Sequence, residues 1–78
     1  MRQRVPRLVV TFHTTADAMA TEQLCRKEGL SGKLISVPRS LTSDCGIAWS
    51  AEPALRKTLE ARLAEAQIDA AGFHELLL

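Results

Sequence analysis

The chain has 78 residues, 46% of them hydrophobic and 24% charged, with a formal net charge of +1 at pH 7. This length predicts a single domain over residues 1–78 with a thin core, in which residues 1–6 form a short basic lead. The near-zero charge excludes a general attraction to nucleic acid or to an anionic membrane. No apolar run approaches the roughly 20 residues that span a bilayer, and the N-terminus lacks a secretory h-region, so we expect a cytoplasmic protein.

Apolar, β-branched runs alternate with helical patterns along the chain. In chain order they predict a strand at residues 8–12, a helix ending at about 27 or 28, strands at 33–37 and 47–51, a second helix opened by Pro53, and a strand at 73–78. Thr14 is placed to cap the first helix, with Asp17 three residues later in a capping box, and Gly29 is placed to end it.

Each predicted helix has one apolar stripe that should face the core. The stripe of the first helix is Ala16, Ala20 and Leu24. The stripe of the second is Leu55, Leu59 and Leu63, extended by Ala66. Cys25 lies one position away from the first stripe, so we expect its thiol to be half-buried and structural. Trp49, on the third strand, is expected to be a packing residue.

The element order β-α-β-β-α-β predicts an α/β (α+β) fold of the ferredoxin-like sandwich type. It would have one four-stranded antiparallel sheet in spatial order 4-1-3-2, with two helices on one face. The other face would be open, yet Val9, Leu76 and Leu78 place apolar side chains on both sides of their strands. We therefore expect a homodimer through the open sheet face.

The segment most typical of a functional site is Pro38–Gly46, a polar loop that is longer than a hairpin needs. It contains Cys45, the strongest potential nucleophile in the loop. In the predicted topology the first two strands are parallel, so this loop leaves the sheet at the edge where the first helix begins. The free N–H groups and the positive dipole of that helix N-terminus would stabilise a thiolate.

Several neighbours would support Cys45 chemically. Arg39 would add positive charge, and Gly46 would permit a close backbone approach or a positive φ. His13 is either a proton acceptor for the thiol or an exposed turn histidine. The polar candidates for binding at this edge are Thr14, Ser40 and Ser43.

A disulfide and a metal site are both disfavoured by the predicted geometry. Cys25 would lie about 15 Å along its helix from the edge that holds Cys45, beyond the reach of a bridge. The same separation weakens a zinc site that combines both cysteines with His13 and His74, and the chain has no CxxC or HxxxH pair. We expect no metal and no cofactor.

Three motifs together resemble a known family. They are Thr11–Thr15 leading into an Ala-rich helix, Val37–Leu41 with a Ser/Thr-rich run to Cys45 and Gly46, and the Glu52-Pro53 pair. This pattern resembles the small bacterial family of selenium/sulfur carrier-like proteins, over nearly the whole chain after Pro6.

The resemblance implies a cysteine that holds sulfur or selenium as a persulfide or selenopersulfide and passes it to a partner. That role would fall on Cys45, with Arg39 and Gly46 matching the motif. A carrier would need a cysteine desulfurase-type donor and an acceptor enzyme.

Other functions stay open on the residues alone. The chain could be a small-molecule-binding or regulatory homodimeric module, in which Ser40, Thr42 and Ser43 bind the ligand and Cys45 is incidental. Cys45 could also be a redox switch through a sulfenic acid or an intermolecular disulfide. A stand-alone enzyme is least favoured, because the chain has no cofactor motif and no second catalytic group in register.

Overall fold

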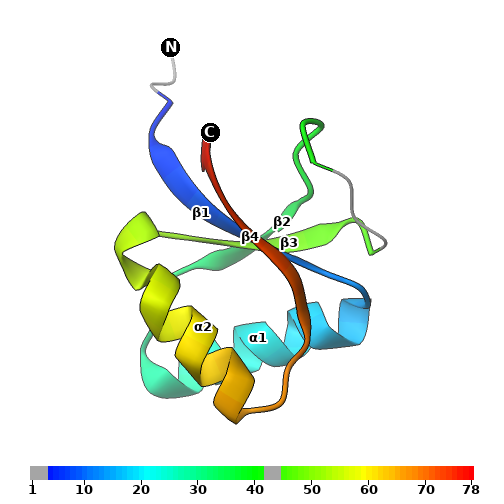
Figure 1. Ribbon diagram of the computed structural model, residues 1–78, viewed down its shortest axis with the longest axis vertical. Coiled ribbons are helices and arrows are strands. Elements are labelled where there is room, and N and C mark those ends of the chain that lie inside the picture. Colours follow the sequence, from blue (N-terminus) through cyan, green and yellow to red (C-terminus); the bar gives the residue numbers. More distant parts are fainter. Residues whose placement is uncertain (1–3, 42–44) are drawn as a thin grey trace.

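The computed structural model describes residues 4–41 and 45–78 (Figure 1). Its elements, in chain order, are β1 (Pro6–Phe12), α1 (Thr15–Glu28), β2 (Lys33–Ser36), β3 (Ile47–Ala51), the 3₁₀ turn η1 (Pro53–Leu55), α2 (Arg56–Glu65) and β4 (Ala70–Leu77). The predicted order of strands and helices is confirmed. The largest difference in bounds is at β4, which begins three residues earlier than its sequence pattern indicates.

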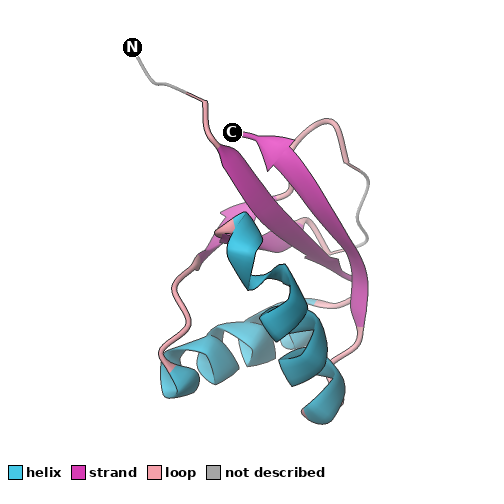
Figure 2. Cartoon of the chain, turned by 60° about the vertical axis from the view of Figure 1, so that its left-hand side comes forward, coloured by secondary structure: helices cyan, strands magenta, loops and turns pink. Residues whose placement is uncertain are grey.

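The four strands form one antiparallel sheet in the order β2-β3-β1-β4, which is 4-1-3-2 when it is followed from the β4 edge. Because β1 and β2 are each antiparallel to β3, they run in the same direction. Both helices cover one face of the sheet and leave the other open (Figure 2). The expected α+β class, with one open antiparallel sheet and two helices, is confirmed.

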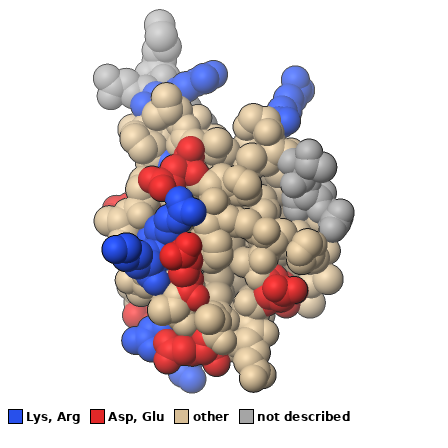
Figure 3. Space-filling model, in the orientation of Figure 1, with Lys and Arg blue, Asp and Glu red and all other residues tan. Residues whose placement is uncertain are grey.

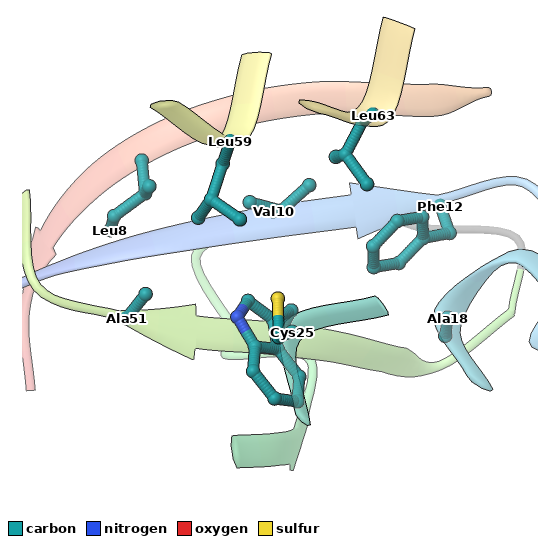
Figure 4. Packing of buried hydrophobic residues seen from close by; sticks show 9 residues of the cluster. Leu8, Val10, Phe12, Ala18, Cys25, Ala51, Leu59 and Leu63 are labelled. Atoms are coloured by element: carbon teal, nitrogen blue, oxygen red, sulfur yellow. The ribbon is translucent and has the colours of Figure 1, made fainter. Parts of the chain in front are cut away.

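The core lies between the sheet and the two helices (Figure 4). Alternate residues of β1 point into it, and Val10 lies opposite Trp49 on β3. The buried side chains of this cluster are Leu8, Val10, Phe12, Ala18, Cys25, Trp49, Ala51, Leu59 and Leu63. Trp49 is only 2% exposed, which confirms its packing role.

Both ends of α1 are closed as the sequence predicts. The Thr14 hydroxyl accepts a hydrogen bond from the Asp17 backbone N–H at 3.2 Å and donates one to the Asp17 carboxylate at 3.0 Å. Gly29 ends the helix in the left-handed conformation with φ of 70°. Its successor Leu30 donates its N–H to the Cys25 carbonyl at 2.8 Å, which satisfies one of the last carbonyls of the helix.

The predicted core face of α1 is wrong. The buried residues are Ala18, Thr21 and Cys25, whereas Ala16 is exposed and Leu24 lies at the margin of the core. Thr21 can be buried because its hydroxyl donates to the Asp17 carbonyl at 2.9 Å, inside the helix itself. Cys25 is therefore fully buried and not half-buried as expected.

The helix α2 packs through Leu59 and Leu63, as its stripe predicts, while Ala66 is exposed just beyond the last turn. Its outer side carries alternating charges (Figure 3). Arg56 bonds to Glu60 at 3.5 Å and also reaches β4, where it meets Glu75 at 2.8 Å. These pairs are exposed to solvent, so they contribute little to stability.

Within the part of the chain that the structure describes, neither helix has the length and apolar content that a bilayer crossing requires.

Candidate functional site

The loop that contains Cys45 connects β2 to β3 and is closed at its base. Ser36 and Ile47 pair across the sheet, and just beyond them the Val37 N–H donates to the Gly46 carbonyl at 3.0 Å. The first part of the loop forms a turn over residues 38–41, in which the Leu41 N–H donates to the Pro38 carbonyl at 3.0 Å. The two ends of the loop are thus held together by the sheet.

Cys45 lies on the return limb of this loop. It is half-buried and packs against the margin of the hydrophobic core. Its thiol donates a hydrogen bond to the Ile47 backbone carbonyl, with an Sγ to O distance of 3.0 Å.

Gly46 follows the cysteine with φ of 73°, in the left-handed region, as the sequence analysis foresaw. A Cβ atom built at this position would meet no atom of the described residues within 4 Å. The glycine is therefore favoured by the backbone conformation and not by a lack of space. It lets the chain reverse direction between Cys45 and the first residue of β3.

The start of α1 lies at the same sheet edge as this loop (Figures 1 and 2). This follows from the register, since β1 ends at Phe12 where β3 begins at Ile47. Both functions of the Thr14 hydroxyl are engaged in the helix cap, so Thr14 acts on this edge by holding the helix N-terminus in place. His13 is exposed in the turn between β1 and α1.

The remaining predicted site residues lie in the first half of the loop, after Pro38, or among the residues that the structure does not describe. Arg39 and Ser40 are exposed in the turn that Pro38 opens. Arg39 forms no ion pair with another described residue. Ser43, with Thr42 and Asp44, lies outside the described residues.

Cys25 has a different chemistry. Both cysteines are free thiols, but Cys25 is 0% exposed on the inner face of α1 (Figure 4), in the same buried cluster as Trp49. Desolvation by burial, with a smaller contribution from the negative charge of Glu28, raises the pKa of the Cys25 thiol from 9.0 to about 11. A thiol that is both buried and protonated at neutral pH is a poor nucleophile.

The residues weighed for a zinc site do not converge. Among residues 4–41 and 45–78, no three His, Cys, Asp or Glu side chains are grouped so that they could hold a metal ion. Cys25 lies in the core between the sheet and the helices. His74, on β4, pairs with Val9 on β1 and faces the open side of the sheet.

A family model described as "Putative Se/S carrier protein-like" matches residues 7–75, which span the fold from β1 to β4 and include the whole Cys45 loop. The chain belongs to this family. No curated protein and no solved structure gave a match. This Se/S carrier-like family is the same family that the sequence motifs resemble, so the expected family membership is confirmed.

One part of the site in this Se/S carrier-like protein was missed by the sequence analysis. The acceptor for the Cys45 thiol is a backbone carbonyl, that of Ile47, and every residue has such a carbonyl. No residue type signals it. The one sequence signal near it is the glycine at position 46, whose positive φ turns the chain back toward β3.

Proposed function

We propose that this Se/S carrier-like protein holds sulfur or selenium on Cys45, as a persulfide or selenopersulfide, and passes it to a partner enzyme. The observation that carries the proposal is the contrast between the two thiols. Cys45 lies on a loop at the surface, whereas Cys25 is sealed in the core. The family to which the chain belongs is named for carriers of these elements.

Loading from a cysteine desulfurase-type donor needs no external oxidant. The Cys45 thiol gives its proton to solvent, and the thiolate attacks the outer sulfur of the donor's persulfide. A bond forms between Sγ and that sulfur, while the bond between the donor's two sulfur atoms breaks. The donor leaves as a thiolate, and the same exchange in reverse hands the sulfur to the thiolate of an acceptor enzyme.

The residues around Cys45 would stabilise the negative charge of a persulfide on its sulfur. A persulfide is an anion, and the N-terminus of α1, fixed by Thr14, together with Arg39 would stabilise it. Gly46 would let the loop adjust when Sγ gains an atom. Ser40, Ser43 and His13 remain predicted supporting residues, as hydrogen-bond donors to the group or to a docked partner.

Intact-mass spectrometry after incubation with a cysteine desulfurase and cysteine tests this function. The wild type and Cys25→Ser should gain about 32 Da per sulfur atom, and the gain should vanish on reduction. Cys45→Ser should gain nothing. A gain that persists in Cys45→Ser, or no gain in any variant with the donor active on its own substrate, would overturn sulfur carriage on Cys45.

We also propose a ferredoxin-like topology and a cytoplasmic location for the chain. The element order, the strand order and the placement of both helices on one face support a ferredoxin-like sandwich. The two free thiols support a reducing, cytoplasmic location. The homodimer through the open sheet face is a prediction that sedimentation at micromolar concentration tests, and the two cations on that face, Arg7 and Lys33, weigh against it.

A further inference from the structure

The open face of the sheet has a hollow of about 450 Å³ at the end far from Cys45. Its lining residues are Val5, Arg7, Lys33, Ile35, Ser50 and Leu78. Arg7 lies in β1, Lys33 and Ile35 in β2 and Ser50 in β3, while Val5 precedes β1 and Leu78 follows β4. Arg7 and Phe12 are five positions apart along β1, which is about 16 Å in a strand, so the hollow and the Cys45 loop lie at opposite ends of the strands.

Two cationic side chains border the hollow, and one of them is held in place. The Arg7 Nε donates to the Ser50 hydroxyl at 3.1 Å, and Ser50 is only 2% exposed. This bond fixes the guanidinium and leaves its two terminal nitrogens for another acceptor, in a geometry that suits two oxygens of one group. Lys33 lies across β3, in register with Ser50.

No acidic side chain on the open side of the described strands offsets the charges of Arg7 and Lys33. The residues that the register places on the open side of the described strands are Arg7, Val9, Thr11, Lys33, Ile35, Ala48, Ser50, Gly72, His74 and Leu76. None of them is acidic. Arg7 and Lys33 form no ion pair with any residue in the described ranges. The acidic residue of β4, Glu75, is bonded to Arg56 on the helix side.

A second copy of the chain fits this face poorly. A symmetric face-to-face dimer would bring two sets of cationic side chains together without an acidic side chain between them, and like charges in contact are unfavourable. The face also has less apolar surface to bury than its sequence indicates. Val9 is already 0% exposed and Ser50 2% exposed in the single chain.

The rest of the lining is aliphatic and suits a small organic body. Val5, Ile35 and Leu78 surround the cations, and Val5 is 48% exposed and Leu78 39% exposed. A volume of about 450 Å³ lies within the range of small-molecule sites, roughly 300–1,000 Å³. The combination of two cations, one buried hydroxyl and an apolar wall matches a ligand with an anionic head and a short aliphatic body.

We propose that this hollow binds a small amphipathic anion, a carboxylate or phosphate ester with a short alkyl chain. The head group takes a paired hydrogen bond from Arg7 and the charge of Lys33. The chain lies against Ile35 and Leu78. The site is separate from Cys45 and does not depend on the proposed sulfur chemistry.

Amide chemical shifts in a ¹H–¹⁵N titration test the site with matched probes. Hexanoate and hexyl phosphate share one alkyl chain and differ in the head group, and hexylammonium has the same chain with the opposite charge. Both anions should shift the amides of Arg7, Lys33 and Ser50 in a saturable way, and hexylammonium should not. The relative affinities of the two anions then identify which head group the hollow prefers.

Two variants locate the binding. Lys33→Gln and Arg7→Gln should each weaken the anions about tenfold, the effect of one lost charge-assisted hydrogen bond. Lys57→Gln, which removes an exposed cation on α2, is the matched control and should change nothing. Lys33 is itself exposed, so its variant keeps the test valid if Arg7→Gln folds poorly.

Three results would overturn the proposal. They are equal binding of hexylammonium, unchanged anion affinity in Lys33→Gln, and shifts on this face that follow protein dilution instead of added anion. The last of these would assign the face to a second copy. Sulfur loading of Cys45 in the same variants should equal that of the wild type, so failure of one site is distinguishable from failure of the other.

Discussion

Cys25 and Cys45 are both free thiols in one small domain, but they differ in burial and in the element that carries them. Cys25 is 0% exposed on the inner face of α1, and burial raises the pKa of its thiol to about 11. Cys45 is half-buried on a loop at the edge of the sheet, with its hydrogen directed to a backbone carbonyl. The comparison shows that the element on which a cysteine lies decides whether its thiol is sealed in the core or accessible at the surface.

The same contrast extends to the neighbours of the two thiols. Trp49, a member of the same buried cluster as Cys25, lies so close to Gly32 that a Cβ atom on this glycine would come within 2.5 Å of the indole ring. At Gly46, beside Cys45, a Cβ atom would meet no atom of the described residues within 4 Å. The packing around the glycine is therefore tight in the first region and loose, among the described residues, in the second.

Alkylation rates would give the largest expected difference between the two regions. With iodoacetamide at pH 8, Cys45 should react at least about a thousandfold faster than Cys25, because Cys25 reacts only when the core opens. Mass spectrometry of the tryptic peptides that end at Arg26 and Arg56 distinguishes the two thiols. In about 8 M urea the rates should converge, and similar rates in the native state would show that the core does not protect Cys25.

Alanine at the two glycines would compare the packing directly. Gly32→Ala should lower the free energy of unfolding by about 2–3 kcal/mol, because its Cβ overlaps the Trp49 ring and the core must shift. Gly46→Ala should lower it by only about 1 kcal/mol, the cost of a left-handed backbone for a residue with a Cβ. Urea unfolding measures both values, and an equal loss in the two variants would contradict the packing difference.

The pH dependence of stability would isolate the buried thiol. The pKa of Cys25 is about 11 in the folded chain and near 9.0 when unfolded, so the unfolded state loses its proton first as the pH rises. The free energy of unfolding should therefore fall by about 1.4 kcal/mol between pH 7 and pH 10 from this group alone.

The matched variants for this measurement are Cys25→Ala and Cys45→Ala. Each should be followed by urea unfolding at both pH values, since other groups also titrate in this range. Cys25→Ala should lose the contribution of about 1.4 kcal/mol, and Cys45→Ala should retain it. Identical pH slopes in Cys25→Ala and the wild type would show that the thiol is not desolvated in the folded state.

Local signals made most of the fold predictable. Thr14 and Gly29 bound α1 as their residue types indicate, and Leu59 and Leu63 bury α2 as their spacing indicates. The second helix ends differently, because Gln67 takes φ of 59°, a conformation for which glycine is the usual signal. The sequence offered no glycine there.

The inner face of α1 was mispredicted because apolar periodicity counts threonine as polar. Thr21 satisfies its hydroxyl within the helix, at the Asp17 carbonyl, and can then occupy the core between Ala18 and Cys25. A pattern based on hydrophobicity alone selects Ala16 instead, which is exposed. Side-chain to backbone bonds of this kind have to be considered before a helix face is assigned.

The candidate site was predictable to the extent that topology determines it. The parallel direction of β1 and β2 was enough to place the Cys45 loop at the edge where α1 begins. The bond from the thiol to the Ile47 carbonyl was not predictable, and neither was the hollow around Arg7. Both arise from the register of strands that are far apart in the sequence, which no local pattern records.

The hydrogen bond from Cys45 to Ile47 links the occupancy of the sulfur to the shape of the loop. An atom that replaces the thiol hydrogen removes the donor, so a modified Sγ has to leave the carbonyl that the free thiol contacts at 3.0 Å. Empty and loaded forms would then present different surfaces around Gly46. Under the proposed function, a donor could select the first form and an acceptor the second, so that the shape of the loop would report whether the sulfur is occupied.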